Sequence, residues 1–237
     1  MRLDVYLTEK KLCKSRTAAQ TLIKSGGVSV SGKVCSKPSQ EVSDSDFVEI
    51  TGEQLHYVGR GGLKLEAAIE RFKLDITGAE CIDIGASTGG FTDCMLQHGA
   101  SRVYAVDVGT DQLVDSLRCD PRVVSMEQTD IRTAELTEAD FIGTDVSFIS
   151  LKLIIPHIHR LLKSGGVAVV LIKPQFEAGR ANLSKNGIVR EERVRLKIRD
   201  EIAEFSEECG FSVIGTEQSP ITGGDGNIEY LMCLRKR

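Results

Sequence analysis

The sequence predicts an α/β protein in two parts, a small N-terminal α+β module and a larger domain with a doubly wound, mostly parallel sheet. Strand-like and helix-like segments alternate from Cys81 to Ile172, as in a parallel sheet with helices on both faces. Basic residues concentrate before Gln40, where eight Lys and Arg stand against two Asp and Glu, so the first 40 residues carry +6 and the rest −10. Four glycines between Gly52 and Gly62 indicate a turn-rich connection. The expected division is a first domain at 1–52, a linker at 53–62 and a second domain at 63–237.

The composition is typical of a soluble globular protein, with 237 residues, 41% of them hydrophobic and 27% charged. The first residues are charged where a secretory signal would be apolar, and the longest apolar run, Val167 to Ile172, is too short to span a membrane. Seven scattered cysteines form no C-x-x-C pair, so we expect reduced thiols and no metal site. These observations predict a cytoplasmic protein without a membrane segment.

The first part is expected to contain two helices, a hairpin and one more strand. Ser15 can cap the second helix, and Gly26 and Gly27 end it. Valines alternate on both sides of the turn Ser31-Gly32-Lys33, which predicts the hairpin. The first helix is expected at 2–7, the hairpin at 28–34 and the further strand at 47–50.

The second part is expected to begin with an amphipathic helix at 63–72, in which Lys64 lies in the first turn and off the apolar face. Strands and helices then alternate along the chain. The remaining elements are expected as a strand at 81–84, a helix from about 91, strands at 103–106, near 123 and at 141–146, a helix at 151–162, a strand at 167–172, a helix at 191–209 and two strands at 211–216 and 228–234.

Ligands of a doubly wound sheet bind at the carboxyl ends of its strands. Gly85, Gly89 and Gly90 follow the first parallel strand and open a helix, which lets the backbone approach a ligand closely. Asp107 ends the next strand 22 residues after Gly85, where an acid can accept both hydroxyls of a ribose. Asp130 follows the third strand and can accept an adenine amino group, or it can be only a helix cap. The spacing predicts an adenosine-type ligand rather than a dinucleotide or a Walker-type phosphate.

The segment that begins at Ser15 resembles a known RNA-binding module. Its sequence S-R-T-A-A-Q-T-L-I-K-S-G-G-V-S-V-S-G-K-V is similar to S4, or alpha-L, domains. The resemblance implies a small α+β domain that contacts the phosphate backbone of RNA, and the basic charge favours the same function because Lys and Arg displace phosphate counterions. A basic helix face that is only solvated is the alternative. The residues expected to contact RNA are Arg2, Lys10, Lys11, Lys14, Arg16, Lys24, Lys33 and Arg60.

The second part resembles the S-adenosylmethionine-dependent methyltransferases of the FtsJ type in the motifs D-I-G-A-S-T-G-G-F-T and V-Y-A-V-D-V-G. With R-G-G-L-K-L, D-V-S-F-I-S, L-I-K-P-Q-F-E and G-N-I-E-Y-L added, the pattern is similar to the TlyA family over nearly the whole chain. The resemblance implies a Rossmann-like class I methyltransferase domain with an antiparallel last strand and S-adenosylmethionine as cofactor. The residues implied at the cofactor are Asp83, Gly85, Ala86, Ser87, Gly89, Gly90, Phe91, Asp107, Val108, Asp130, Ile131 and Asp145.

The resemblance also implies four catalytic residues, Lys64, Asp145, Lys173 and Glu229. Methyl transfer to a ribose 2′-hydroxyl needs a base near the moment of attack, because a neutral hydroxyl is a poor nucleophile. Lys173 follows the apolar strand V-A-V-V-L-I, where burial and the like charge of Lys64 favour the neutral amine that can act as a base. We therefore expect Lys173 as the base and the other three as positioning partners, with alignment supplying part of the rate.

A basic RNA module joined to a ribose methyltransferase implies a structured RNA substrate. Similarity to the TlyA family narrows this to ribosomal RNA or ribosomal subunits and to 2′-O-methylation of a cytidine, which would flip out of its stack. We expect a monomer without a metal ion. The basic segment 175–195 is interpreted as a substrate-side loop, with a solvent-facing loop as the alternative. Two other functions stay open: a membrane-active, haemolysin-like protein, for which the sequence offers no apolar span, and a non-catalytic RNA-binding protein.

Overall fold

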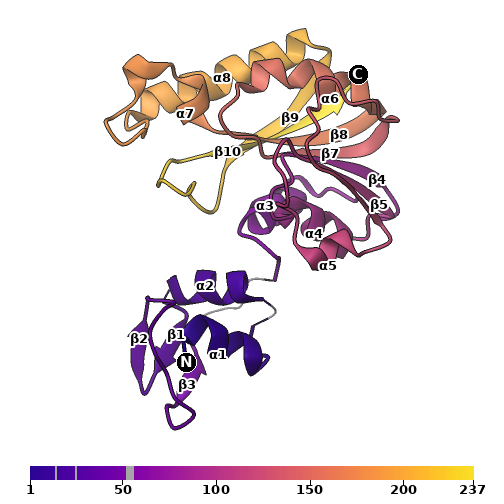
Figure 1. Ribbon diagram of the computed structural model, residues 1–237. Helices are drawn as coiled ribbons and strands as arrows, with labels where there is room; N and C mark the ends of the chain where they lie inside the picture. The colour runs from indigo at the N-terminus through magenta and orange to yellow at the C-terminus, as the bar shows by residue number, and fades with distance from the viewer. Residues whose placement is uncertain (14, 25, 52–55) are drawn as a thin grey trace. The chain divides into compact units, whose positions relative to one another are not determined.

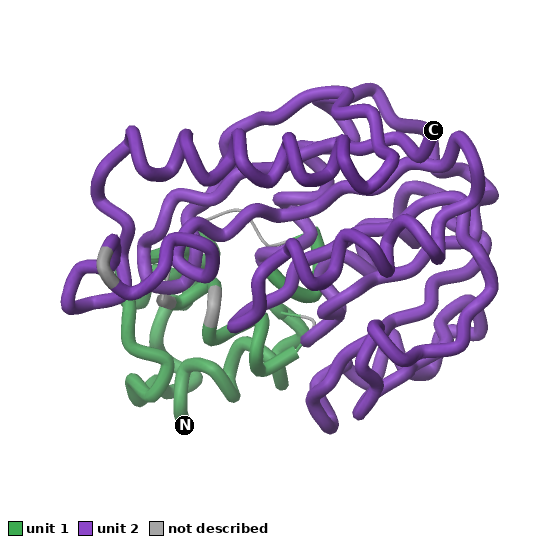
Figure 2. The backbone as a smooth tube through the Cα atoms, turned by 90° about the horizontal axis from the view of Figure 1, so that it is seen from above, with its two compact units in different colours: residues 1–59 green, residues 60–237 purple. Residues whose placement is uncertain are grey.

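The computed structural model describes residues 1–13, 15–24, 26–51 and 56–237. The chain divides into two compact units, Met1–Gly59 and Arg60–Arg237, which are coloured separately in Figure 2. Each unit has its own hydrophobic core, and each is described by itself.

The first unit packs two helices against a three-stranded antiparallel sheet of order β2-β1-β3 (Figure 1). Ser31 and Gly32 form the hairpin turn with φ of 49° and 79°, the positive values that a two-residue turn between twisted strands requires. Ser15 Oγ accepts a hydrogen bond from Ala18 N and so caps the second helix as expected. Its elements are α1 (Leu3–Glu9), α2 (Arg16–Lys24), β1 (Val28–Val30), β2 (Lys33–Cys35) and β3 (Val48–Ile50).

The second unit is built on a seven-stranded sheet of order β6-β5-β4-β7-β8-β10-β9. The strands β4 to β8 run parallel to one another, and β10 runs antiparallel to both of its neighbours, β8 and β9. The strands are β4 (Glu80–Ile84), β5 (Arg102–Val106), β6 (Val123–Met126), β7 (Ala139–Thr144), β8 (Leu162–Ile172), β9 (Phe211–Gln218) and β10 (Tyr230–Lys236). This arrangement confirms the predicted doubly wound sheet with an antiparallel last strand.

Helices cover both faces of this sheet, with α3, α4 and α5 on one side and α6 and α8 on the other (Figure 1). Fully buried aliphatic residues such as Ile142, Ile155 and Ile202 fill the space between the sheet and α6 and α8. The helices are α3 (Gly61–Phe72), α4 (Gly90–Gln97), α5 (Asp115–Arg118), α6 (Ile155–Leu161), α7 (Pro174–Glu177) and α8 (Glu192–Glu208), with single 3-10 turns at Leu151–Leu153 and Arg180–Asn182.

Several predicted boundaries are wrong. The single helix expected at 151–162 is a 3-10 turn followed by α6, which begins near Pro156 because proline fits only the first turn of a helix. The strand expected from Val167 begins at Leu162, directly after α6. The strand expected at 141–146 ends at Thr144, and the last strand begins at Tyr230, so Asp145 and Glu229 lie just outside their strands.

The parallel strands bring the ends of four segments to one edge of the sheet. Gly85 follows β4, Asp107 follows β5, Asp145 follows β7 and Lys173 follows β8. The carboxyl edge of a doubly wound sheet is its usual ligand site, so the chemistry is expected there. None of the helices in the described part of the chain combines the length and the apolarity that a membrane crossing needs.

Candidate active site

Two lysines and two carboxylates form a continuous chain of ion pairs at this edge of the sheet. Lys173 Nζ lies 2.6 Å from Asp145 Oδ1, and Lys64 Nζ lies 3.8 Å from Asp145 Oδ2. Lys64 Nζ also donates to Glu229 Oε2 at 2.6 Å. The first and last of the four residues are 165 residues apart in the chain. Their charged groups alternate in sign, so each ammonium has a carboxylate partner.

Lys64 and Glu229 are buried as a pair. Lys64 is 7% exposed and Glu229 is 2% exposed, so the expectation that Lys64 lies off the buried face of its helix is wrong. A buried ammonium is tolerated because the Glu229 carboxylate neutralises it at hydrogen-bond distance. Gly223 packs directly against this carboxylate, since a Cβ built on it would lie 2.6 Å from Glu229 Oε1.

The segments that carry Asp145 and Lys173 are tied together by three further hydrogen bonds and one contact between aromatic rings. Lys173 Nζ donates to Ser147 Oγ at 2.8 Å. Ser150 Oγ and Leu151 N donate to the two oxygens of Glu177 at 2.6 and 2.7 Å. The rings of Phe148 and Phe176 also lie against each other, with centroids 5.0 Å apart. Sequence reasoning missed Ser147 and Glu177, although both stand in the motifs D-V-S-F-I-S and L-I-K-P-Q-F-E.

Phe148 is held in an uncommon conformation. Its φ is 64°, in the left-handed region that a bulky side chain rarely adopts, and its side chain is 91% exposed. Such outliers persist only where the surroundings enforce them, and they cluster at functional sites.

A cavity of about 510 Å³ adjoins Asp145. Its size is within the range of small-molecule and cofactor sites. Seven of the residues predicted at the cofactor line it: Gly85, Ser87, Asp107, Val108, Asp130, Ile131 and Asp145. The other five predicted cofactor residues are buried and do not line it: Asp83, Ala86, Gly89, Gly90 and Phe91.

Two glycines in the turn between β4 and α4 are needed because other parts of the protein leave no room for a Cβ atom there. Gly85 has φ of 84°, and a Cβ on it would lie 2.6 Å from the Asp145 carbonyl oxygen. A Cβ on Gly89 would clash with Leu117 Cδ1. These close approaches place the end of β4 against the Asp145 segment and the start of α4 against α5.

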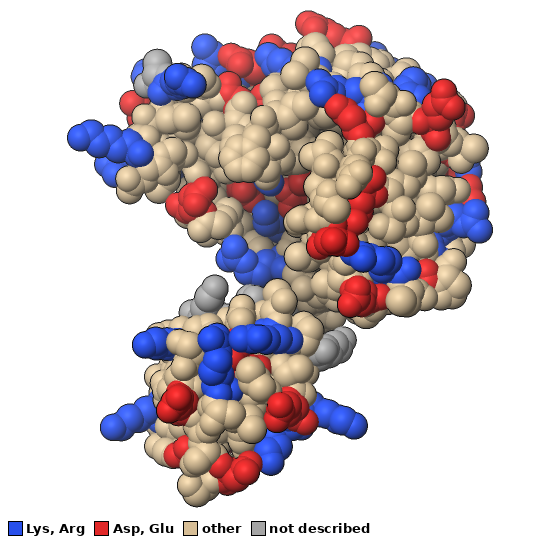
Figure 3. Space-filling view, in the orientation of Figure 1, with Lys and Arg blue, Asp and Glu red and all other residues tan. Residues whose placement is uncertain are grey.

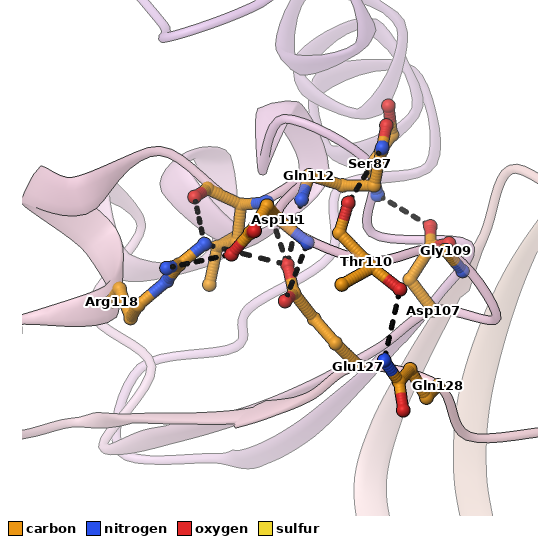
Figure 4. Close-up of polar contacts among 10 residues, drawn as sticks. Ser87, Asp107, Gly109, Thr110, Asp111, Gln112, Arg118, Glu127 and Gln128 are labelled. Carbon is orange, nitrogen blue, oxygen red and sulfur yellow. Dashed lines mark hydrogen bonds and ion pairs between the residues drawn. The ribbon is translucent and has the colours of Figure 1, made fainter.

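Two carboxylates hold the loop that follows β5 by its backbone N–H groups (Figure 4). Asp107 accepts from Ser87 N and from Gly109 N, both at 2.7 Å. Glu127 accepts from the N–H groups of three consecutive residues at 2.9, 2.8 and 3.0 Å, and these bonds, led by that from Leu113 N, lower the pKa of Glu127. Sequence reasoning missed Glu127, because its partners are backbone groups.

Asp130 lies at the cavity wall with its carboxylate paired to Arg132. Arg132 Nη2 donates to Asp130 Oδ2 at 2.6 Å, and this side-chain hydrogen bond is the main cause that lowers the pKa of Asp130 to about 2. Asp130 also accepts from Arg132 N at 2.9 Å, the local contact expected of a capping acid. Both interpretations of Asp130 therefore remain compatible with its position.

Asp83 is fully buried in β4, one residue before Ile84, which lines the cavity. Its Oδ2 accepts from Thr92 Oγ1 at 2.6 Å, whereas its Oδ1 has no partner among the described residues. Burial raises the pKa of Asp83 to about 7. An unpartnered buried oxygen at this place fits a site whose ligand brings a hydrogen-bond donor or a positive charge.

The residues predicted to contact RNA are mostly on the surface of the first unit, where basic side chains gather (Figure 3). Arg2 and Arg16 are ion-paired with the buried Asp4, and Lys10 is ion-paired with Asp44. Lys11 follows α1 and Lys33 begins β2, and both are exposed. Arg60 belongs to the second unit, where it precedes α3. Lys14 and the side chain of Lys24 lie outside the described residues.

Comparisons with known proteins identify both units. The model of the FtsJ-like methyltransferase family matches residues 57–236, and the model of the S4 domain matches residues 1–48. Hemolysin A of Brachyspira hyodysenteriae is 44% identical over 238 residues, which are 98% of this chain and 98% of that protein. The 16S/23S rRNA (cytidine-2'-O)-methyltransferase TlyA of Mycobacterium tuberculosis is 38% identical over 239 residues, which are 99% of this chain and 89% of that protein.

Solved structures agree with the fold. A Streptococcus thermophilus protein with a provisional hemolysin name is 48% identical and superposes with a TM-score of 0.80, covering 100% of this chain and 88% of that one. An S-adenosylmethionine dependent methyltransferase from Mesorhizobium loti is 16% identical with a TM-score of 0.57 over 75% of this chain and 100% of that one, which shows a shared fold. Since the family model spans most of the chain and a TlyA protein matches it over nearly its full length, the chain belongs to the FtsJ-like methyltransferase family and, with its N-terminal S4 domain, to the TlyA group within it.

Proposed function

We propose that the protein methylates the 2′-hydroxyl of a cytidine in ribosomal RNA with S-adenosylmethionine as the donor. The observation that carries this proposal is the chain of ion pairs from Glu229 through Lys64 and Asp145 to Lys173, in which Asp145 lines the cavity. The relatives named as rRNA (cytidine-2'-O)-methyltransferases support the choice of RNA, base and position.

The residues of the cavity fit this donor. Asp107 would hold the ribose hydroxyls, and Asp130 would accept from the adenine amino group. The carboxylate of Asp145 lines the cavity, which suits a ligand that carries a positive charge. S-adenosylmethionine, when bound, supplies the activated methyl group.

Lys173 is the proposed base. Once its ammonium has lost a proton, Nζ accepts the proton of the 2′-hydroxyl as the oxygen attacks, which turns a poor nucleophile into a good one. Asp145 at 2.6 Å and Ser147 at 2.8 Å fix the position of this nitrogen. Lys64 pairs with the other oxygen of Asp145, and Glu229 holds Lys64 in place. The four groups therefore act as one aligned unit.

Phe148 offers a place for the target base. Its ring is exposed, lines the cavity and lies against Phe176 on one side. Bases of structured RNA that leave their stack are commonly received by aromatic side chains, and a cytidine inside a helix must leave its stack to present its ribose to the cavity. The S4 domain, with its basic surface, would hold the surrounding RNA through phosphates.

The variant Lys173→Ala tests this proposal when methyl transfer and RNA affinity are measured together. We expect transfer of labelled methyl groups to rRNA to be lost and RNA affinity to be unchanged, because Lys173 is only partly exposed and paired with Asp145. Lys163→Ala, which removes a lysine paired with Asp140 near the opposite end of β7, should keep full activity. Equal methylation of an RNA that carries 2′-deoxycytidine at the target position would refute ribose methylation.

A further inference from the structure

A buried carboxylate lies among the arginines of the first unit. Asp4, in α1, is 0% exposed, and its two oxygens accept five hydrogen bonds. Oδ1 accepts from Arg2 Nε and from Val5 N, both at 3.0 Å. Oδ2 accepts from Arg2 Nη2 and Arg16 Nε at 3.0 Å and from Gln20 Nε2 at 2.7 Å. These bonds, led by those from Arg2, hold the pKa of Asp4 well below its usual range.

The two arginines remain open to the outside. Their side chains are 46% and 53% exposed, although both are bonded to a fully buried group. In the described contacts Arg16 reaches Asp4 through Nε alone and Arg2 through Nε and Nη2. The Nη1 groups of both arginines and Nη2 of Arg16 can therefore donate to an external acceptor, and a guanidinium fork matches the geometry of phosphate oxygens.

We infer that Asp4 is a positioning residue for RNA binding, which fixes Arg2 and Arg16 side by side as a preformed clamp for backbone phosphate. This inference rests on the proposed function, because it needs the first unit to bind RNA. An unrestrained arginine loses rotamer freedom when it grips a phosphate. In the clamp that entropy is lost when the unit folds, so less is lost when RNA binds.

Net charge and positioning predict opposite effects of removing Asp4. Arg2, Arg16 and Asp4 together carry a net charge of +1. Removal of the Asp4 carboxylate raises this charge and strengthens the long-range attraction of RNA. If Asp4 only balanced charge, Asp4→Asn would bind RNA as tightly as the parent or more tightly. If Asp4 positions the clamp, Asp4→Asn binds more weakly in spite of the added positive charge.

The test measures the affinity of the full-length protein for a labelled rRNA fragment at several salt concentrations. We expect Asp4→Asn to weaken binding roughly tenfold and to reduce the salt slope by about 0.7–1.8, which is one or two lost phosphate contacts. Asp44→Asn is the matched control, because it removes an acid that pairs with Lys10 but is 79% exposed. This control should bind as tightly as the parent or more tightly.

A second variant keeps the inference testable if Asp4→Asn disturbs folding, which circular dichroism would report. Arg16→Lys keeps the positive charge, but lysine has a single ammonium group. It cannot bond to Asp4 and at the same time offer a guanidinium fork to phosphate, so we expect at least about a threefold loss of RNA affinity. Parent-like binding by Arg16→Lys, or by a folded Asp4→Asn, would overturn the inference.

Variants of the arginines themselves separate this inference from the proposed function. If Arg2→Ala and Arg16→Ala weaken binding but folded Asp4→Asn does not, the first unit binds RNA without help from Asp4. If neither arginine variant changes RNA affinity, the proposed role of the first unit in binding RNA is itself wrong.

Discussion

Gly223 offers a sharp test of the catalytic geometry, because it packs against a buried carboxylate of the ion-pair chain. The Cβ of an alanine at this position would lie 2.6 Å from Glu229 Oε1 and 3.2 Å from its Cδ. Ordinary contact begins at 3.4 Å, so the carboxylate must retreat by about 0.8 Å. Glu229 is 2% exposed and bonded to Lys64 at 2.6 Å, so it cannot retreat without moving Lys64 from Asp145.

A displacement of this size is enough to reduce catalysis strongly. Misplacing a catalytic group by about 1 Å can cost about 100-fold in rate, so we expect kcat/KM of Gly223→Ala for methylation of rRNA to fall by about 10- to 100-fold. Overpacking should lower the free energy of unfolding by only about 1–3 kcal/mol, which leaves the protein folded.

The neighbouring glycine is the matched control for this experiment. A Cβ on Gly224 meets no atom within 4 Å, so Gly224→Ala should keep the kcat/KM of the parent. Both variants are assayed for transfer of labelled methyl groups, with urea denaturation as the check on folding. Equal activity of the two variants would refute the view that the position of Glu229 matters for catalysis.

Three further predictions concern charge. Glu229→Ala leaves Lys64 buried with its remaining carboxylate partner at 3.8 Å, so this variant should lose about 3–5 kcal/mol of unfolding free energy in urea. The double variant Lys64→Met/Glu229→Leu should regain most of that stability and stay inactive. An active double variant would contradict the role assigned to this pair. Burial raises the pKa of Asp83 to about 7, so the folded state holds a proton that the unfolded state releases between about pH 4 and 7. Relative to Asp83→Asn, the unfolding free energy of the parent should therefore fall as pH rises through this window, by up to about 1.4 kcal/mol per pH unit, and identical pH profiles of the two proteins would disprove the shift. Asp107→Ala removes the acceptor of two backbone N–H groups at the cavity, so calorimetry should show about a tenfold or greater loss of S-adenosylmethionine affinity, whereas Asp111→Ala, in the exposed part of the same loop, should bind normally.

The sequence was sufficient to predict the order of the strands and of the longer helices along the second unit, because buried parallel strands are apolar runs and the helices between them are amphipathic. It did not predict α5 and α7, since four residues are too few to show a helical period. The interruption between Leu153 and Ile155 was missed for a similar reason, although Pro156 was visible in the chain.

The site was predicted less completely than the fold. Motif resemblance pointed to Lys64, Asp145, Lys173 and Glu229, and the structure places their charged groups within one chain of ion pairs. Helical periodicity alone placed Lys64 outside the core, because the apolar pattern cannot show that a carboxylate from a distant segment neutralises a lysine. Glu127, Glu177 and Asp4 were missed because their partners are backbone groups or side chains that only the folded chain brings close.

The most direct measurement is the identity of the methylated nucleoside. The protein would be incubated with ribosomal subunits and S-adenosylmethionine that carries an isotopically labelled methyl group, and the RNA would then be digested to nucleosides for mass spectrometry. We expect the label in 2′-O-methylcytidine and its absence when Lys173→Ala replaces the parent. Label on a base, or no label in any nucleoside, would contradict the proposed ribose methylation.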